Sequence, residues 1–194
     1  MKTKRKIALL SKTLLFVLTL FVSQTYAQEL SLNNATSELT VFGTSNLHDW
    51  DVKAEKQHGN MTLDKSDQLQ IKRLQVSVEA ESLKSGKSGM DKNTYKALKT
   101  KKHKNISFDM KEVKSISKLN DNRYRVSVTG NLTIAGVTKN TGLDFILEVA
   151  SSQVVLKGSK SFKMTEFEVD PPKALLGTVT TGDEVKIEFK TVFK

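Results

Sequence analysis

Cysteine is missing from the 194-residue chain, and its absence excludes several classes of site. Without thiols the protein forms no disulfide, offers no thiol nucleophile and supplies no thiolate ligand to a metal. It also lacks the residue to which a lipoprotein anchor is attached. The fold must therefore be held together by burial of apolar side chains, which for an exported chain suits a bacterial periplasm better than a disulfide-rich extracellular setting.

The sequence also lacks a hydrophobic run long enough to cross a bilayer. Its most apolar segment, Leu14–Val22, is well short of the roughly 20 residues that a spanning helix needs. Basic residues precede this segment, and Ser23–Ala27 follows it and ends in small residues that a signal peptidase accepts. We therefore expect residues 1–27 to be a signal peptide cleaved after Ala27, and residues 28–194 to form a single periplasmic domain.

Much of the positive charge belongs to this N-terminal segment. The full chain has a net charge of +10, and residues 1–27 carry five Lys or Arg and no acid, so the predicted mature protein has a net charge of +5. Nucleic acid is not an expected partner, because the chain is predicted to be exported and no aromatic stacking platform lies among its lysines.

Residue patterns for catalysis or metal binding are scarce. The three histidines, at positions 48, 58 and 103, show no metal-ligand spacing. Ser45, His48 and Asp49 are a nucleophile, base and acid close in sequence, but on an alternating strand His48 faces away from the other two. A role in a turn, or a hydrogen bond to a ligand head group, suits His48 better. We expect no catalytic residues, no metal and no cofactor.

The dominant pattern is alternation of apolar and polar residues with period two, which is typical of strands with one buried face. The alternation predicts eight to nine strands. They lie at residues 39–42, 50–54, 61–63, 74–80, 106–110, 124–134, 143–149, 162–164 and 185–189.

Two local features interrupt this alternation. The apolar positions change parity between Leu69, Ile71 and Leu74, which a β-bulge near Lys72 would explain. Asp91–Lys99 instead has apolar residues at helical spacing, an acid at its start and lysines at its end, which predicts one short helix.

Short polar connections favour antiparallel neighbours, and a closed barrel would leave no exposed sheet edges. We therefore predict an all-β fold, an antiparallel eight-stranded barrel with one short helix, and keep a β-sandwich as the alternative. The interior of such a barrel is either filled by its own side chains or holds one small ligand. The alternation does not choose between these two cases.

Several ordered motifs resemble one known family. They are Gly43–Trp50 after the first predicted strand, Ser82–Gly86 before the helix, His103–Phe108, Gly130–Lys139, and the C-terminal pieces Lys163–Phe167, Asp170–Pro172 and Gly182–Val185. Together they resemble the YceI-like family, the polyisoprenoid-binding, lipocalin-like proteins of bacterial periplasms. Asn105 stands where that family usually has proline. The resemblance implies a lipocalin-like barrel around a long apolar cavity that binds an isoprenoid or another long-chain lipid, such as an isoprenoid quinone, without turnover.

Alternation assigns a set of apolar side chains to the inside of the barrel, where they would line such a cavity; their alternative role is that of an ordinary core. The set is Phe42, Trp50, Val52, Val76, Val78, Phe108, Met110, Val126, Val128, Leu132, Phe145, Leu147, Met164, Ile187 and Phe189.

Lysines are concentrated around the predicted helix. They are Lys84, Lys87, Lys92, Lys96, Lys99, Lys101, Lys102 and Lys104. A solvated face is their ordinary role. Our functional hypothesis is that they rim the barrel mouth, with His48, Lys99 and Lys102 near a ligand head group, and attract an anionic membrane surface.

A homodimer is left open, as are two other functions: a filled barrel that acts as a stress-response or interaction module, and a lipid-acting enzyme.

Overall fold

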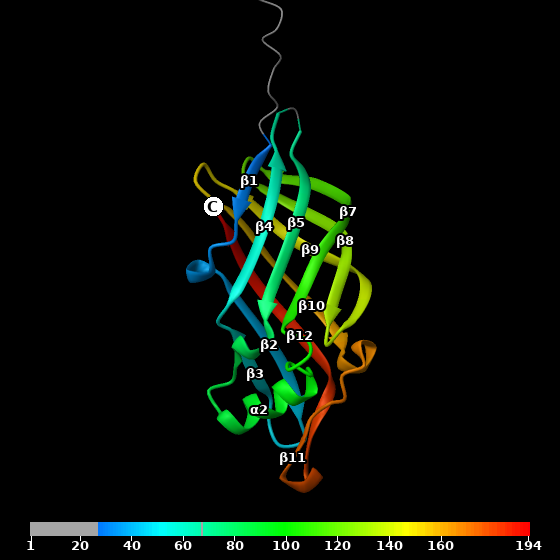
Figure 1. The fold of residues 1–194 in the computed structure, drawn as a ribbon. Helices are drawn as coiled ribbons and strands as arrows, with labels where there is room; N and C mark the ends of the chain where they lie inside the picture. Colours follow the sequence, from blue (N-terminus) through cyan, green and yellow to red (C-terminus); the bar gives the residue numbers. More distant parts are fainter. Residues whose placement is uncertain (1–26, 67) are drawn as a thin grey trace, which may run out of the picture.

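The alternating segments form long antiparallel strands in the computed structural model, which describes residues 27–66 and 68–194 (Figure 1). The predicted signal peptide lies outside these residues, apart from Ala27. In the part of the chain that is described, no helix combines the length and the apolar character needed to span a membrane.

The elements follow one another with short connections. The strands are β1 (Gln28–Ser31), β2 (Glu38–Ser45), β3 (Trp50–Ala54), β4 (Gln57–Asp64), β5 (Gln70–Glu79), β6 (Leu83–Lys84), β7 (Asn105–Asn120), β8 (Arg123–Ile134), β9 (Val137–Val149), β10 (Val154–Lys163), β11 (Lys173–Ala174) and β12 (Val179–Phe193). The helices are α2 (Ser88–Ala97) and the 3₁₀ turns η1 (Asn34–Thr36), η2 (Ala80–Ser82), η3 (Met164–Phe167) and η4 (Leu175–Gly177).

One curled sheet contains nearly all of these strands. Its order is β1-β4-β5-β7-β8-β9-β10-β12-β2-β3-β6, and β11 pairs separately with β12. At one end the sheet closes on itself, because the chain at the end of β1 also pairs with the end of β12. Leu32 bridges Phe193, and Ser31 and Lys194 exchange two backbone hydrogen bonds of 2.8 and 2.9 Å.

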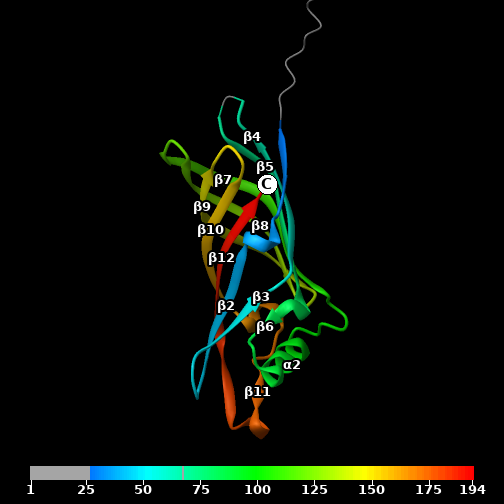
Figure 2. The same ribbon diagram turned by 90° about the vertical axis from the view of Figure 1, so that its left-hand side faces the viewer.

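The opposite end is built differently. There β2 lies beside β12, followed by β3 and the short β6, and α2 comes directly after β6 (Figures 1 and 2). The all-β antiparallel prediction is confirmed, although the sheet has 12 strands rather than eight. The additional strands are mainly β1, β6 and β11, which are too short to show an alternation of their own.

The predicted bulge near Lys72 is confirmed by the register of β4 and β5. Thr62 pairs with Arg73 and Leu63 pairs with Ile71, so Lys72 is the extra residue. One extra residue restores the inward direction of Leu74 after Ile71, and both side chains are buried.

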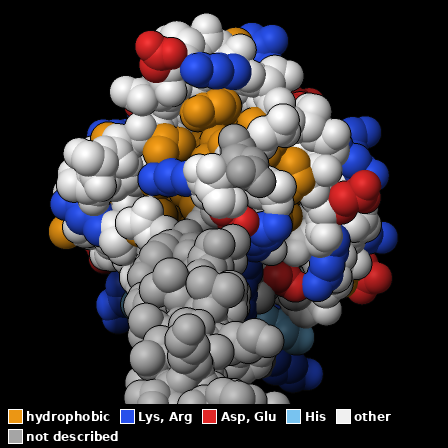
Figure 3. Space-filling model, turned by 90° about the horizontal axis from the view of Figure 1, so that it is seen from above, with side chains coloured by type: hydrophobic (Ala, Val, Ile, Leu, Met, Phe, Trp, Pro, Cys, Tyr) orange, Lys and Arg blue, Asp and Glu red, His pale blue; other side chains and the backbone are white. Residues whose placement is uncertain are grey.

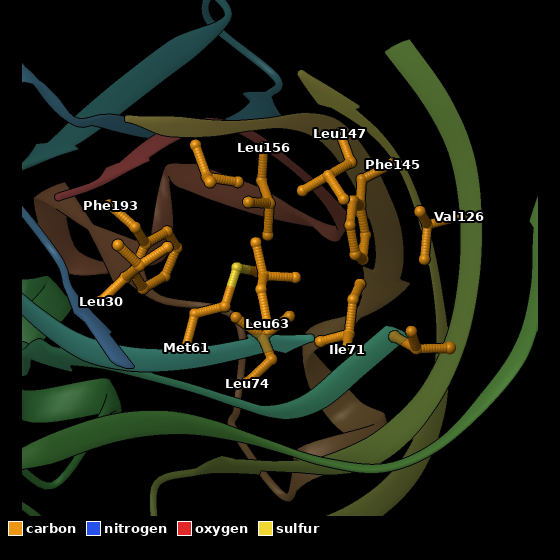
Figure 4. Close-up of a cluster of buried hydrophobic side chains, with 12 residues drawn as sticks. Leu30, Met61, Leu63, Ile71, Leu74, Val126, Phe145, Leu147, Leu156 and Phe193 are labelled. Atoms are coloured by element: carbon orange, nitrogen blue, oxygen red, sulfur yellow. The ribbon is translucent and has the colours of Figure 1, made fainter. Parts of the chain in front are cut away.

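The end of the barrel around β1 and the C-terminus is filled by side chains, and we call it the packed end (Figure 4). Its buried cluster comprises Leu30, Met61, Leu63, Ile71, Leu74, Val126, Val128, Phe145, Leu147, Val154, Leu156 and Phe193. Seen along the barrel from this end, hydrophobic side chains lie at the centre, with charged and polar side chains around them (Figure 3). The barrel is therefore solid over part of its length.

Candidate ligand-binding site

A cavity of about 820 Å³ occupies the other end of the barrel, which we call the cavity end. A volume of this size is typical of sites that hold small organic ligands. Its walls come from β2 and β3, from the cavity-facing side of α2, and from the segment between β10 and β12. The apolar lining residues are Leu39, Val41, Trp50, Val52, Val78, Leu83, Met90, Ala97, Leu98, Ile106, Ile134, Phe162, Met164, Phe167, Val169, Pro172, Ala174, Leu176, Val179, Val185 and Ile187.

A smaller space of about 110 Å³ lies along the same interior. It shares Leu39, Val78, Ile106 and Ile187 with the large cavity, and it also touches Leu74 and Leu156 of the packed cluster. The apolar interior therefore extends from the cavity toward the packed end.

Helix α2 is held against the barrel by side chains that bond to the preceding segment. The Asp91 carboxylate accepts hydrogen bonds from the backbone N–H (2.8 Å) and the hydroxyl (2.6 Å) of Ser85, and these bonds lower the pKa of Asp91. Tyr95 Oη lies 2.9 Å from the carbonyl of Glu81 and accepts from Lys84 Nζ at 2.6 Å, which raises the pKa of Lys84. The helix thereby presents Met90, Thr94 and Ala97 to the cavity.

Trp50 forms part of the opposite wall, and its position depends on a glycine. Its indole ring lies over Gly43 of the neighbouring strand, so a Cβ at position 43 would clash with the ring. The indole Nε1 donates a 2.9 Å hydrogen bond to the Thr44 carbonyl. Trp50 is the single tryptophan of the chain, so its fluorescence reports directly on the cavity.

The turn between β2 and β3 is organised by Ser45 and His48. Ser45 Oγ donates to the His48 carbonyl (2.7 Å) and accepts from the His48 backbone N–H (3.1 Å). The His48 ring donates through Nδ1 to the Asp49 carbonyl at 2.7 Å. The Ser45 hydroxyl thus bonds to the backbone of His48, and the His48 ring bonds to the backbone of Asp49, an arrangement that stabilises the turn. The Ser45 and His48 side chains also border the cavity.

The 3₁₀ turn η3 closes another side of the cavity. Thr165 donates from its backbone N–H (2.9 Å) and its hydroxyl (2.7 Å) to the Asp183 carboxylate of β12, which lowers the pKa of Asp183. This contact fixes Met164 and Phe167, which both line the cavity. Phe167 is also packed edge-on against Phe162, with ring centroids 5.1 Å apart.

The charged groups of the lining have one sign. Lys87, Lys92 and Lys173 border the cavity, together with His48, and no Asp or Glu is present among the described lining residues. All four side chains belong to exposed residues, so the charge lies at the outer part of the cavity. The arrangement provides an apolar interior and a basic rim, and it suits a ligand with a long apolar body.

Comparison with protein families identifies this architecture. The family model of the YceI-like domain matches residues 21–193. The chain belongs to the YceI-like family. No curated protein matches it at a significant level.

Solved structures of YceI-like and related proteins share the fold. The chain is 18% identical to Burkholderia cenocepacia BcnA (TM-score 0.66, covering 83% of this chain and 98% of that one). It is 12% identical to a polyisoprenoid binding domain from Saccharophagus degradans implicated in plant cell wall breakdown (TM-score 0.68, covering 87% and 99%). It is 18% identical to a Campylobacter jejuni YceI protein (TM-score 0.55, covering 71% and 80%).

The segment Gly130–Lys139, one of the motifs of the YceI-like resemblance, spans the β8–β9 hairpin. Ala135 and Gly136 form its two-residue turn with φ angles of 49° and 86°, a conformation common in tight hairpins. The ring of His103 packs directly on Gly136 and leaves no room for a Cβ there. The turn places Ile134 in the cavity wall.

The structure separates the residues that we predicted to line one YceI-like cavity. Trp50, Val52, Val78, Met164 and Ile187 border the large cavity, with His48. Val76, Phe108, Leu132 and Phe189 border the small space, together with Val78 and Ile187. Val126, Val128, Phe145 and Leu147 belong to the packed cluster, and Met110 packs against it.

Three further predicted residues lie elsewhere. Phe42 is 39% exposed and faces outward, because the inward positions of β2 are Leu39, Val41 and Gly43. Lys99 and Lys102 follow the C-terminal end of α2 and are exposed outside the cavity lining, whereas Lys87 and Lys92 border it.

Several lining residues escaped sequence reasoning. Ala97 and Leu98 lie on the predicted helix and Met90 directly precedes it; the apolar spacing of this helix was a signal that it covers an interior. Met164 was predicted to line the cavity, but from a strand, whereas it begins η3. Phe162 to Val179 form a wall from turns and short strands, and such a wall shows no periodicity.

Proposed function

We propose that this chain is a periplasmic binding or carrier protein that holds a long-chain apolar lipid, such as a polyisoprenoid or isoprenoid quinone, in the cavity, without chemical turnover. The observation that carries the proposal is the division of the barrel interior. One end is packed, whereas the other contains about 820 Å³ lined mostly by aliphatic and aromatic side chains.

Burial of an apolar chain supplies enough free energy for such binding. Each CH₂ group that leaves water contributes about 0.8 kcal/mol. A few isoprene units would therefore offset the roughly 4 to 15 kcal/mol cost of association. Little polar recognition is needed, in keeping with a lining whose charged side chains are all exposed.

Two further observations support the proposal. The chain belongs to the YceI-like family, and a structure of the same fold is described as a polyisoprenoid binding domain. The charged or titratable side chains of the described lining are His48 and three lysines, all exposed. His48 is engaged in its turn, so binding fits this site better than acid–base chemistry.

Location in the periplasm is proposed from the N-terminal sequence. A basic start, a short apolar run and small residues ending at Ala27 are the pattern of a cleaved export signal. Mass spectrometry of the protein recovered from a bacterial periplasm tests both the location and the cleavage site, since the expected N-terminus is Gln28.

The binding proposal is tested by filling the cavity while Trp50 remains the only tryptophan. Ala97→Phe places a ring in the cavity from α2, and Ala150→Phe makes the same change at an exposed position between β9 and β10. The probe is a conjugated polyene fatty acid, which accepts excitation energy from tryptophan. We expect quenching of Trp50 by the probe in the wild type, a loss of affinity of about tenfold or more in Ala97→Phe, and no loss in Ala150→Phe.

Organic extraction and mass spectrometry of the purified wild type identify the natural ligand. The proposal is wrong if the wild type neither retains a lipid nor binds the probe, or if Ala97→Phe and Ala150→Phe bind the probe equally well.

A further inference from the structure

Two leucines at the cavity end are unusually exposed. Among the described residues, four large hydrophobic side chains are exposed: Phe42 (39%), Leu119 (47%), Leu47 (68%) and Leu176 (109%). The two most exposed belong to neighbouring segments, the β2–β3 turn and η4, and Leu176 itself borders the cavity. Single exposed apolar residues are ordinary, but two at the mouth of an apolar cavity indicate a contact surface.

The two segments that carry these leucines are joined by Asn46. Its side-chain amide donates to the Thr178 carbonyl (2.9 Å) and accepts from the Thr180 backbone N–H (3.0 Å). The Asn46 backbone N–H donates to the Thr180 carbonyl at 3.1 Å. Leu47 and Leu176 are therefore presented by one hydrogen-bonded unit, which lies at the bottom of the molecule in Figures 1 and 2.

The backbone at η4 holds Leu176 in an unfavourable conformation. Its φ and ψ angles of 56° and 28° lie in the left-handed region, which residues with a Cβ rarely adopt. Gly177 follows with φ of 92°. Backbone strain of this kind persists only where the surrounding structure holds it in place, and it clusters at sites that bind ligands.

Exposed lysines lie at the rim of the same cavity. Lys87, Lys92 and Lys173 border it, and its described lining contains no Asp or Glu. Exposed apolar side chains with lysines beside them are the combination that binds the interface of an anionic bilayer, where apolar groups enter the acyl region and ammonium groups contact phosphates.

We propose that the cavity end docks on an anionic lipid bilayer. Leu47 and Leu176 insert at the interface, and Lys87, Lys92 and Lys173 contact the lipid phosphates. The mouth of the cavity then faces the acyl chains, so a lipid can pass between bilayer and cavity without crossing water. Docking needs no bound ligand; the transfer step rests on the proposed function.

The test measures co-sedimentation of the exported protein with vesicles. The protein is purified from the periplasm of a bacterial host and its N-terminus is checked by mass spectrometry, because an apolar leader would itself bind lipid. The vesicles consist of phosphatidylcholine alone or of phosphatidylcholine with phosphatidylglycerol. We expect the wild type to bind the anionic vesicles and to be released by salt.

Two sets of variants locate the contact. Leu47→Ser/Leu176→Ser should weaken binding on the order of tenfold, whereas Leu119→Ser, at an exposed leucine near the β7–β8 turn, should not. Replacement of Lys87, Lys92 and Lys173 by Gln should weaken binding on the order of fivefold for each lysine. Replacement of Lys65, Lys114 and Lys118 by Gln removes the same net charge away from the cavity end and should have a smaller effect.

Circular dichroism verifies that each variant is folded. The docking proposal is overturned if the wild type does not bind anionic vesicles, or if the cavity-end variants bind as the wild type does. Probe binding through Trp50 is measured separately on the same wild-type protein. Lost vesicle binding with retained probe binding therefore overturns docking alone, and absence of probe binding overturns the carrier function.

Discussion

Among the residues that the structure describes, Gln57 is the buried polar residue whose side chain is least satisfied by hydrogen bonds. It lies on β4, is 1% exposed, and neither atom of its side-chain amide has a hydrogen-bond partner. Its backbone N–H is satisfied by the Asn34 side chain at 2.7 Å, so the secondary structure does not depend on the amide. An unpaired buried amide destabilises a fold by about 1 to 3 kcal/mol.

We predict that Gln57→Met stabilises the protein by about 1 kcal/mol, because methionine has similar length and no strong polar group to satisfy. Thermal unfolding followed by circular dichroism should show a rise in Tm of roughly 2 to 4 °C. Gln75→Met is the control and should not stabilise the protein, because the Gln75 side chain has hydrogen-bond partners to lose: it accepts from Arg73 and donates to Asp109. A Gln57→Met variant less stable than the wild type would contradict the prediction and indicate a polar partner for the amide.

At the scale of single residues, alternation predicted direction well where one parity was clearly polar. Trp50, Val78 and Ile187 face the interior as expected. In β2 both Val41 and Phe42 are apolar, and the larger residue was the wrong choice. The pairing with β3 decides the direction, since Val41 lies opposite Val52 and Phe42 lies opposite Asp51. That register is a tertiary property, which one strand does not reveal.

At the scale of elements, η3 depends on the Asp183 carboxylate. Both Thr165 bonds favour the ionised form, so the pKa of Asp183 is lower in the folded protein than its ordinary value of 3.8. A lowered pKa means that this stabilisation is complete at neutral pH and is lost as the pH falls through the folded pKa.

We predict that Thr165→Val raises the pKa of Asp183 toward its ordinary value, as measured by NMR titration of the carboxyl carbon. The variant should also be less stable than the wild type at neutral pH, and this difference should shrink as the pH falls below 3.8. Probe affinity should decrease, because one of the two bonds that hold η3, and with it Met164 and Phe167, is lost. If the Asp183 pKa does not change in the variant, the Thr165 hydroxyl does not stabilise the ionised carboxylate.

The elements that could be predicted are those with a strong pattern. The bulge at Lys72 followed from parity alone, and the predicted helix at 91–99 corresponds to α2 at Ser88–Ala97. Asp91 was expected to begin the helix; it lies within the first turn and instead binds Ser85. The first part of β10 was missed because Val154, Val155 and Leu156 are all buried, which leaves no alternation.

At the scale of the whole molecule, the barrel combines a solid half with a hollow half. Alternation predicted the curled sheet, since it depends on which face of each strand is apolar. It could not predict where the interior is filled, because that depends on which side chains from distant strands meet. Phe145 and Leu147 fill the space beside Met61 and Ile71, whereas the strand ends near α2 leave their space open.

This division predicts that stability and ligand affinity respond to substitutions at different places. Leu147→Ala removes a side chain with 0% exposure from the packed cluster and should lower the free energy of unfolding by about 2 to 5 kcal/mol. Affinity for the polyene probe should remain unchanged, provided that it is measured where the variant is folded.

Leu39→Ala makes the same chemical change at a half-buried position that borders both cavities. Its effect on stability should be smaller, because less surface is lost from the interior, and probe affinity should fall because the cavity wall loses contact area. Urea unfolding and Trp50 quenching measure the two quantities on the same samples. Equal effects of both substitutions on both quantities would mean that the barrel interior acts as one core, and the hollow half would then have no separate role.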